Sequence, residues 1–408
     1  MYTKRLICIF MSALLLASCA TVLKQKEDNG DEYCAVTGTG DEALQYKSVS
    51  AGVDAGLELD VEAAILVEKE TGEILYSENP DAPRPIASIT KVMTMILVME
   101  AIEEGRISLD DYVTASEHAW SMGGSQIWLE PGEIMTVDEL FRAVAVQSAN
   151  DAAVALAEHV AGSEDAFVVM MNEKAAELGM NKTTFKNSNG LDEEGHLSTA
   201  RDVAAMSREC LRHELVREYV TIWQSELRDG ETELTNTNKM LRTFDGITGL
   251  KTGTTSMAGV CITASAERDG MELIAVVLGS STSATRFAAA KDMLEYGFAN
   301  YELADIGFNP ADLNPVRVKL GESQYCEIYY SIPDNVVVER GKGGTLSYSV
   351  EMAESQAAPV EAGQILGKIT VYSEGIVIGE YPISSVNHIN KLDYGHSFRM
   401  LLDALLAL

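Results

Sequence analysis

Ser88 and Lys91 lie three residues apart at the start of a long apolar stretch. Residues 92–99 are apolar except for Thr94, which predicts a buried helix whose first turn holds both side chains on one face. A serine hydroxyl becomes an effective nucleophile when an adjacent base takes its proton, and desolvation lowers the pKa of a buried lysine enough for that role. The backbone N–H of Ser88, at a helix start, can face a developing oxyanion. This pair predicts acyl transfer, although one Ser-x-x-Lys arises by chance roughly once in 400 residues.

Two further short segments offer partners for this pair. Ser148-Ala149-Asn150 falls between one helical pattern that ends near residue 146 and another that starts at residue 151, so its side chains are expected on a loop. Lys251-Thr252-Gly253 opens a predicted strand and is followed by Thr254. Each motif alone is weak, but the three in this order are the signature of penicillin-binding proteins and class A β-lactamases.

The strand motif suits the binding of an extended peptide that ends in a carboxylate. Gly253 has no side chain, so a peptide can lie against the strand and pair with its backbone. Thr252 and Thr254 alternate to one face and offer hydroxyls to the carboxylate. Lys251 adds a positive charge near that carboxylate.

The loop motif suits proton transfer and amide binding. Ser148 can pass a proton between Lys91 and a leaving nitrogen. Asn150 can both donate to and accept from a substrate amide. The predicted catalytic residues are therefore Ser88, Lys91 and Ser148, and the predicted substrate-binding residues are Asn150, Lys251, Thr252, Gly253 and Thr254.

The elements around these motifs predict an α+β domain over residues 61–304. Apolar runs at 63–68 and 73–77, separated by Glu70-Thr71-Gly72, predict a β-hairpin that leads to Ser88. Helical periodicity follows at 137–146, 152–161, 166–178 and 199–220, and strand patterns return at 249–254, 260–267 and 271–279, before a helix over 283–298. This order predicts one antiparallel sheet built from both ends of the segment, flanked by helices and interrupted by a helical insertion.

Near residues 309–315 the sequence pattern changes to a series of short predicted strands. Short strand patterns at 316–320, 326–330, 336–339, 346–351, 364–372 and 376–382 predict a separate small all-β domain over 312–386. In the last segment, 394–408, apolar residues at helical spacing predict an amphipathic helix. That helix could dock on its own domain or lie in a membrane interface.

Residues 1–19 have the layout of a bacterial export signal, with Lys4 and Arg5 before an apolar run. Leu16-Ala17-Ser18-Cys19 resembles a lipobox, which predicts lipidation of Cys19 and attachment to the outer face of the cytoplasmic membrane. Ordinary cleavage after Ala20 is the alternative. Residues 20–60, rich in acidic residues, Gly and Ser, predict a flexible tether.

Composition limits the partners of the protein. With 46% hydrophobic residues, the 408-residue chain can bury a large core. Its net charge of −31, or −33 once the two basic leader residues are removed, repels phosphates and argues against nucleic acid as a partner. Outside the leader, Cys34, Cys210, Cys261 and Cys326 are scattered and predict no disulfide framework.

Together the motifs resemble those of the serine D-alanyl-D-alanine carboxypeptidases, the low-molecular-weight penicillin-binding proteins of peptidase family S11. The resemblance covers roughly residues 63–298 and includes Thr71-Gly72, Gly124-Ser125-Gln126, Ser148-Ala149-Asn150-Asp151-Ala152-Ala153, Met171-Asn172, Leu178-Gly179-Met180, Asn189-Gly190-Leu191-Asp192, His196, Ser198-Thr199-Ala200-Arg201-Asp202, Asn236-Thr237-Asn238 and Gly249-Leu250-Lys251-Thr252-Gly253.

The resemblance implies a fold and an activity. It implies a β-lactamase/transpeptidase-like catalytic domain, then the family's C-terminal β domain, with a terminal helix that attaches the enzyme to the membrane surface. It also implies removal of the terminal D-alanine from peptidoglycan pentapeptide stems through an acyl-enzyme on Ser88, without a cofactor, and inhibition by β-lactam antibiotics such as penicillin. The oxyanion hole would be formed by the backbone N–H groups of Ser88 and Thr254.

One position departs from the pattern. Some family members carry an arginine between the two asparagines of the segment before Lys-Thr-Gly, where it helps to hold the substrate carboxylate, and this chain has Thr237 there. Carboxylate binding would then depend on Lys251, Thr252 and Thr254, or on another arginine such as Arg242.

Four alternative functions can be compared with the motifs, and the sequence argues against two of them. A class A β-lactamase would need a Glu-x-x-Leu-Asn loop, which the sequence lacks. A metallopeptidase would need clustered ligands, but the histidines show no recognisable zinc spacing, and His196 is expected to be structural. A D,D-endopeptidase of the same fold, or a non-catalytic envelope lipoprotein that binds muropeptide or senses β-lactam, would keep the same motifs.

Overall fold

The computed structural model describes residues 20–26, 32–38, 56–395, 398 and 406. The predicted export signal and Cys19 lie outside these residues, as does most of the predicted terminal helix. The chain divides into two units: one comprises residues 42–302, and the other comprises residues 1–41 and 303–408. Within the described residues, no helix is long and apolar enough to span a membrane.

A five-stranded antiparallel sheet forms the framework of the first unit. Its strand order is β4 (Ile74–Glu78), β3 (Ala63–Glu68), β11 (Met271–Ser280), β10 (Gly259–Arg268) and β9 (Ile247–Thr255). Strand β3 is buried along its whole length, because its apolar sequence lies between β4 and β11 under helices. The sheet therefore joins both ends of the unit, and the predicted β3–β4 hairpin is confirmed.

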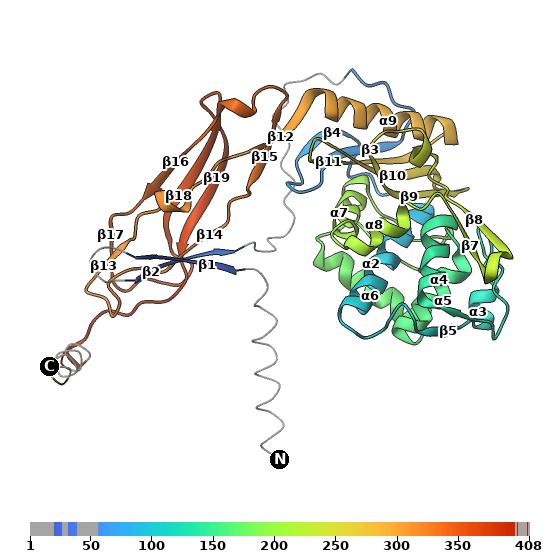
Figure 1. Ribbon diagram of the computed structural model, residues 1–408, viewed down its shortest axis with the longest axis horizontal. Coiled ribbons are helices and arrows are strands. Elements are labelled where there is room, and N and C mark those ends of the chain that lie inside the picture. The colour runs from blue at the N-terminus through green and yellow to red at the C-terminus, as the bar shows by residue number, and fades with distance from the viewer. Residues whose placement is uncertain (1–19, 27–31, 39–55, 396–397, 399–405, 407–408) are drawn as a thin grey trace, which may run out of the picture. The chain divides into compact units, whose positions relative to one another are not determined.

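Helices pack on both sides of this sheet (Figure 1). Helix α9 (Ser283–Asn300), which begins at a Thr282 capping box, packs on β10 and β11. Helix α7 (Ala200–Cys210) packs on β11 and β3 from the other side (Figure 1). The arrangement confirms the predicted α+β fold with an antiparallel sheet flanked by helices.

The helical insertion surrounds α2 (Lys91–Glu103), in which every residue from Lys91 to Met99 is buried. A helix that is apolar on all sides is stable only inside a core, and α2 contacts helices of the insertion on several sides. The other elements are η1 (Ala87–Thr90), β5 (Tyr112–Thr114), α3 (Glu117–Trp120), β6 (Ile134–Thr136), α4 (Val137–Arg142), the π-helical turn η2 (Ala143–Gln147), α5 (Asn150–Ala161), α6 (Glu164–Glu177), α8 (Glu214–Val220), β7 (Gln224–Leu227), η3 (Arg228–Gly230), β8 (Thr232–Thr235) and η4 (Lys239–Arg242).

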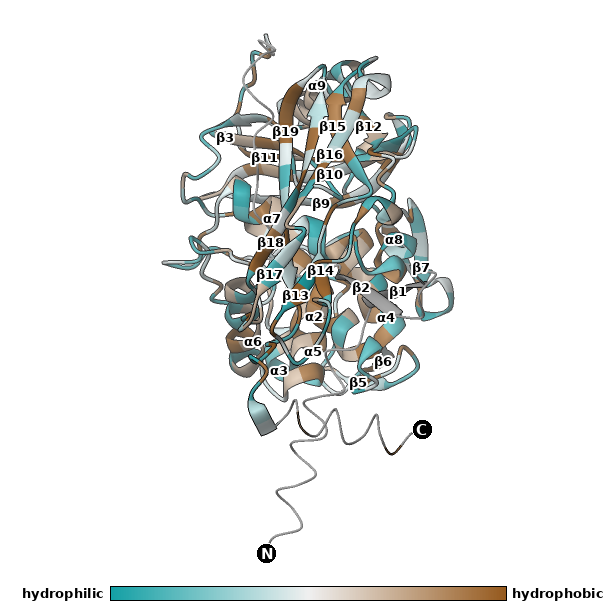
Figure 2. Cartoon of the chain, turned by 90° about the vertical axis from the view of Figure 1, so that its left-hand side faces the viewer, coloured by the Kyte–Doolittle hydropathy of each residue, from teal (hydrophilic) through white to brown (hydrophobic). Residues whose placement is uncertain are grey.

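The second unit is built from strands. One sheet has the order β1 (Ala20–Lys26), β2 (Glu32–Gly38), β14 (Ile328–Tyr330), β19 (Ile376–Ser385), β18 (Ile365–Ser373) and β16 (Leu346–Met352). Two small sheets pair β12 (Tyr301–Asp305) with β15 (Asn335–Glu339) and β13 (Arg317–Lys319) with β17 (Ser355–Ala357). Short η5 (Pro310–Asp312) and η6 (Gly343–Thr345) turns connect them. These strands carry both hydrophobic and hydrophilic residues (Figure 2), and the buried hydrophobic residues form one core, as predicted for a small β domain.

The structure differs from the predicted tether in two stretches. Strands β1 and β2 pair antiparallel over residues 20–26 and 32–38, and β2 pairs in parallel with β14. The runs Thr21-Val22-Leu23 and Ala35-Val36-Thr37 supply the β-branched residues that favour strands. The abundance of acidic residues and glycine around these short runs obscured this pattern in the sequence.

Candidate active site

Ser88 lies in η1, the short helical turn that leads directly into α2. The preceding residue, Ala87, has a φ of 50°, a left-handed conformation that side chains other than glycine rarely adopt. Ser88 itself is half-buried, whereas Lys91, the first residue of α2, is completely buried. The local chain therefore holds the serine at the surface of the unit and the lysine beneath it.

The Lys91 ammonium contacts three segments of the chain. Its Nζ donates to Ser88 Oγ at 3.1 Å, to Asn150 Oδ1 at 2.5 Å and to the backbone carbonyl of Asn189 at 2.7 Å. None of these three acceptors is a carboxylate, so burial is not offset by a direct ion pair. Desolvation lowers the pKa of Lys91 well below its usual value, and the nearby charge of Lys251 lowers it further, against an opposing effect of Asp151. The site favours a neutral amine beside the serine hydroxyl.

Asn150 and Ser148 come from the turn between η2 and α5. Asn150 begins α5, and its Nδ2 donates to the carbonyl of Gly123 at 2.6 Å, so both ends of its side-chain amide have partners within the protein. Ser148 adopts a left-handed φ of 63° where η2 ends and is 5% exposed. Among the described residues its hydroxyl makes no hydrogen bond, so the structure places it near the site without a contact to Lys91.

Strand β9 brings the Lys251-Thr252-Gly253 motif beside η1. It is the last strand of the sheet, so its outer backbone edge is available to a further strand. A Cβ atom at Gly253 would lie 2.9 Å from the carbonyl oxygen of Ile86 and 3.0 Å from the backbone nitrogen of Ser88. Glycine is therefore required here because η1 packs directly on the strand.

The two threonines of β9 differ in their surroundings. Thr252 is buried and donates to the hydroxyl of Thr237 at 2.7 Å. Thr237, the residue between the two asparagines, thus lies directly beside the Lys-Thr-Gly strand. Thr254 is exposed, and its hydroxyl donates to the carbonyl of Gly253 at 2.7 Å. Both hydroxyls thus have acceptors within the protein, and of the two threonines only Thr254 is exposed.

Lys251 is also fully buried, and its Nζ donates to the carbonyl of Thr252 at 2.9 Å. Desolvation, followed by the charge of Arg286, lowers the pKa of Lys251 to about 7. Sequence reasoning missed Arg286, which lies on α9 and is 5% exposed. Its Nη1 donates to the carbonyls of Gly253 at 3.2 Å and Cys261 at 3.1 Å, so it joins β9 and β10 behind the motif. An arginine in a helical pattern gives no sequence signal of such a role.

The loop that follows residue 187 closes the site from the side of α2. Gly190 has a φ of 85°, and a Cβ there would lie 2.0 Å from the Ala87 carbonyl oxygen. His196 Nδ1 accepts from the backbone N–H of Lys186 at 3.3 Å, so its Nε2 carries the proton toward Thr90 Oγ1 at 2.9 Å. Burial lowers the pKa of His196 to about 4, which keeps the ring neutral. These contacts fit the structural role that the sequence predicted for this histidine.

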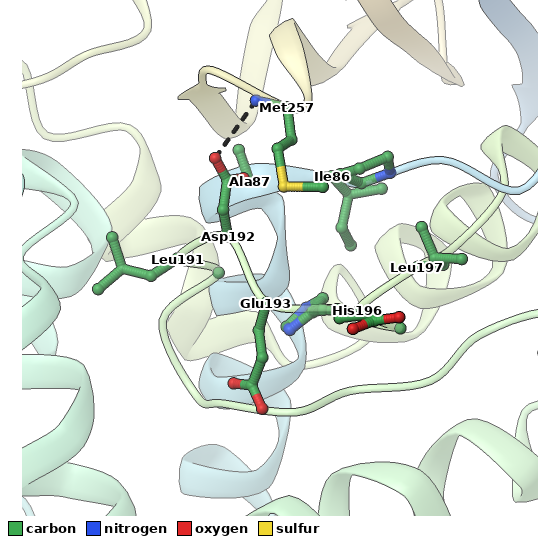
Figure 3. A pocket seen from close by; sticks show the side chains of 12 residues that line it. Ile86, Ala87, Leu191, Asp192, Glu193, His196, Leu197 and Met257 are labelled. Carbon is green, nitrogen blue, oxygen red and sulfur yellow. Dashed lines mark hydrogen bonds between the residues drawn. The ribbon is translucent and has the colours of Figure 1, made fainter.

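A cavity of about 370 Å³ lies between this loop and η1. Figure 3 shows Ile86 and Ala87 on one side, Met257 above, and the loop residues Leu191, Asp192, Glu193 and His196 on the other. Asp192 fixes one end of the cavity, because its carboxylate accepts from the backbone N–H of Met257 at 3.2 Å. The cavity therefore combines apolar walls with an acidic rim next to the segment that carries Ser88.

Comparison with known families gives two matches. Residues 47–282 match the family described as D-alanyl-D-alanine carboxypeptidase, Peptidase S11. Residues 309–391 match the family described as penicillin-binding protein 5, C-terminal domain. The two matches fall in different structural units.

Individual relatives agree with these matches. The chain is 40% identical over 339 residues to the D-alanyl-D-alanine carboxypeptidase DacF of Bacillus subtilis, covering 82% of this chain and 87% of that protein. It resembles the structure of penicillin-binding protein 5 from Haemophilus influenzae with a TM-score of 0.74 and 30% identity, covering 83% of this chain and 100% of that one. Penicillin-binding protein D2 of Listeria monocytogenes, solved in its cefotaxime-bound form, is 35% identical, covers 59% of this chain and 98% of its own, and gives a TM-score of 0.55.

Proposed function

Because the chain belongs to the D-alanyl-D-alanine carboxypeptidase family and is a serine-type carboxypeptidase, we propose specific roles for two of its residues. Ser88 is the nucleophile, and Lys91 is the general base. The observation that carries the proposal is the 3.1 Å contact between the Ser88 hydroxyl and a completely buried lysine amine. The substrate is a peptidoglycan pentapeptide stem that ends in D-alanyl-D-alanine, and β-lactams are inhibitors that acylate the same serine.

Acylation begins when the neutral Lys91 amine accepts the proton of the Ser88 hydroxyl. The oxygen then attacks the carbonyl carbon of the penultimate D-alanine. The negative charge that develops on the carbonyl oxygen faces the backbone N–H groups of Ser88 and Thr254. The close packing of Gly253 on η1 supports this role, because it holds the two donor segments against each other.

Collapse of the tetrahedral intermediate breaks the peptide bond and leaves an ester on Ser88. The departing amine of the terminal D-alanine must gain a proton, which Lys91 returns through the hydroxyl of Ser148. Ser148 lies on the turn that also supplies Asn150, whose Oδ1 contacts Lys91, and this shared turn supports the path. Water then attacks the ester, with Lys91 again taking a proton, and releases the shortened stem and the free serine.

Substrate binding uses the outer edge of β9. An extended peptide adds to the sheet as a sixth strand, and its terminal carboxylate is held by Lys251 and the hydroxyls of Thr252 and Thr254. Thr237 supports Thr252 in place of the arginine found in some relatives. The cavity beside η1 receives part of the stem upstream of the scissile bond, since it opens next to the segment that carries the nucleophile.

The assignment is tested by intact-mass analysis after penicillin treatment and by mass spectrometry of a pentapeptide digest. We expect one penicilloyl adduct on the parent, no adduct on Ser88→Ala, and loss of one alanine from the pentapeptide. An adduct that survives in Ser88→Ala would exclude Ser88 as the nucleophile. Cleavage of cross-linked dimers with no release of terminal alanine would instead favour the endopeptidase reading.

We further propose that the enzyme works on the outer face of the cytoplasmic membrane, held by a lipid on Cys19 and by the terminal segment 394–408. The lipobox-like Leu16-Ala17-Ser18-Cys19 supports the lipid, and the apolar helical spacing supports the second contact. Mass analysis of the protein from membranes should show a diacylated N-terminal cysteine, and Cys19→Ala should lack it. If the parent protein carries no lipid and partitions into membranes to the same extent as Cys19→Ala, Cys19 is not lipidated and that part of the proposal is wrong.

A further inference from the structure

Three side chains with metal-binding chemistry meet at the far end of α2. One oxygen each of Glu100 and Glu209 and a ring nitrogen of His213 all lie within 4.8 Å of one another. Glu100 is in the last turn of α2, Glu209 is in the last turn of α7, and His213 is the residue before α8. A single ion at this point would connect three helices.

The second observation concerns the two ring nitrogens of His213, which is 7% exposed. Its Nδ1 lies 2.8 Å from a carboxylate oxygen of Glu103. A carboxylate only accepts hydrogen bonds, so Nδ1 carries a proton, which leaves Nε2 as the ring nitrogen that can ligate a metal ion. That Nε2 atom is buried and has no hydrogen-bond partner among the described residues. Such an uncompensated buried nitrogen is costly in a folded protein and is the arrangement that a bound cation would satisfy.

The arrangement around His213 also has the form found in metal sites. Metal-ligating histidines nearly always donate their other N–H to a carboxylate or carbonyl, which fixes the tautomer and the ring orientation. Glu103 supplies this carboxylate. One imidazole and two carboxylates suit Zn²⁺ and related first-row divalent ions, which complete their coordination with water.

Two basic side chains reach the same carboxylates. Lys174 Nζ lies 2.5 Å from Oε1 of Glu100, and Arg212 lies 3.2 Å from Oε2 of Glu209. Each contact uses one oxygen, so each carboxylate keeps the other for a metal ion. Lys174 also pairs with Glu177 at 3.3 Å and is therefore free to turn toward it when an ion enters.

We propose that Glu100, Glu209 and His213 form a divalent cation site of the zinc class, oriented by Glu103. The site is structural, because α2 rises about 1.5 Å per residue and Glu100 is nine residues from Lys91 at the other end. By holding the C-terminal end of α2 against α7 and α8, the ion stabilises the helix on which the catalytic lysine is mounted. This role goes beyond the peptidase reaction, in which the ion takes no part.

The test uses the full chain, purified without a histidine tag and treated with a chelator. Zn²⁺ should bind in isothermal titration calorimetry, and it should raise the melting temperature by an amount that increases with the logarithm of the free Zn²⁺ concentration above the dissociation constant. Glu209→Gln and His213→Ala should each lose this binding. Glu103→Gln, which changes an exposed group that does not touch the ion, should weaken it by about 10–100-fold. Lys174→Met should strengthen it, because a competing cation is removed.

His388→Ala is the matched control, because His388 is an exposed histidine paired with Glu361 in the other unit. It should bind zinc as the parent does. Penicillin acylation of Glu209→Gln should equal that of the parent, which shows that the variant is folded. The proposal is overturned if the parent does not bind zinc or if Glu209→Gln still binds it. It is also overturned if only His388→Ala loses zinc binding.

Discussion

The Lys91 amine and the Ser88 hydroxyl are 3.1 Å apart, with the lysine completely closed off from solvent and the serine only half-buried. The substrate can thus reach the nucleophile, while bulk solvent does not hydrate the Lys91 amine. This relation makes the protonation state of Lys91 the quantity on which the activity depends.

Replacing Lys91 by arginine tests that dependence. A guanidinium keeps its charge at any working pH, so Lys91→Arg preserves the positive charge but removes the base. The second-order rate of acylation by a fluorescent penicillin should fall by roughly 10² to 10⁴, the range typical for loss of a general base. Circular dichroism would verify the fold. If a well-folded variant acylates within about tenfold of the parent, Lys91 is not the base.

The pH dependence of acylation should have two limbs. Activity rises with pH as Lys91 loses its proton, and the buried environment places that rise below the usual range of a lysine. Activity toward a carboxylate-bearing substrate then falls above about pH 7 as Lys251, whose pKa is about 7, loses the charge that holds the carboxylate. Lys251→Arg stays charged and should remove the alkaline limb. An alkaline limb that is identical in this variant would show that another group titrates there.

Lys251 should also make stability depend on pH. Its pKa is about 7 in the folded chain and near 10.5 when exposed, so the unfolded chain binds more protons between these values. The free energy of unfolding, compared with that of Lys251→Met, should therefore rise with pH from about 7 to about 10.5. Urea titrations of both proteins at several pH values measure the difference. A difference that is constant with pH would mean that Lys251 titrates normally.

Arg286→Gln tests the influence of α9 on the same lysine. Removing the guanidinium takes away a charge that lowers the pKa of Lys251, so the alkaline limb should move to higher pH. The variant also loses the bonds to the carbonyls of Gly253 and Cys261 and should melt at a lower temperature. Arg268→Gln, which removes an exposed ion pair with Glu295 at the far end of β10, is the control and should leave the pH profile unchanged.

Gly190→Ala should distort the turn that carries the nucleophile. Both Gly190 and Gly195 have positive φ values, so alanine at either position costs about 1–2 kcal/mol from backbone strain. Only at position 190 would the new Cβ meet the Ala87 carbonyl, at 2.0 Å, whereas at position 195 it meets a lysine side chain at an ordinary 3.5 Å. Acylation should drop strongly in Gly190→Ala and little in Gly195→Ala. Equal effects in both variants would show that this contact is unimportant.

The sequence predicted those parts of the site that depend on short-range order. Helical spacing places Ser88 and Lys91 on one face, and the strand motif places Gly253. The sequence alone was therefore enough to predict all three positions. The substrate-binding role of Asn150 stays a prediction, and the structure adds contacts of its amide oxygen with Lys91 and of its amide nitrogen with the Gly123 carbonyl. The Asn189 carbonyl and Arg286 were missed, because a backbone acceptor and a helical arginine become functional only through tertiary packing.

The same reason explains what composition could not reveal. Glu100, Glu209 and His213 have no recognisable metal-ligand spacing, since they come from three helices that are brought together only by the packing of α2, α7 and α8. Likewise, the sequence marks Thr237 by its place between two asparagines, but only the fold shows that it accepts a hydrogen bond from the Thr252 hydroxyl. Contacts between segments that are distant in the sequence can be recognised only in the three-dimensional structure.

The pairing of β3 with β11 bears on how the chain reaches its folded state. Ala64 lies opposite Val277, roughly 210 positions later in the sequence. While the chain is being synthesised, β3 has only β4 as a neighbour, and its six apolar-rich positions stay uncovered until β11 has emerged. Contacts of such long range form slowly and leave aggregation-prone edges exposed meanwhile. A chain in which residues 271–280 are not yet available therefore holds an incomplete sheet, in which one edge of β3 has no partner strand.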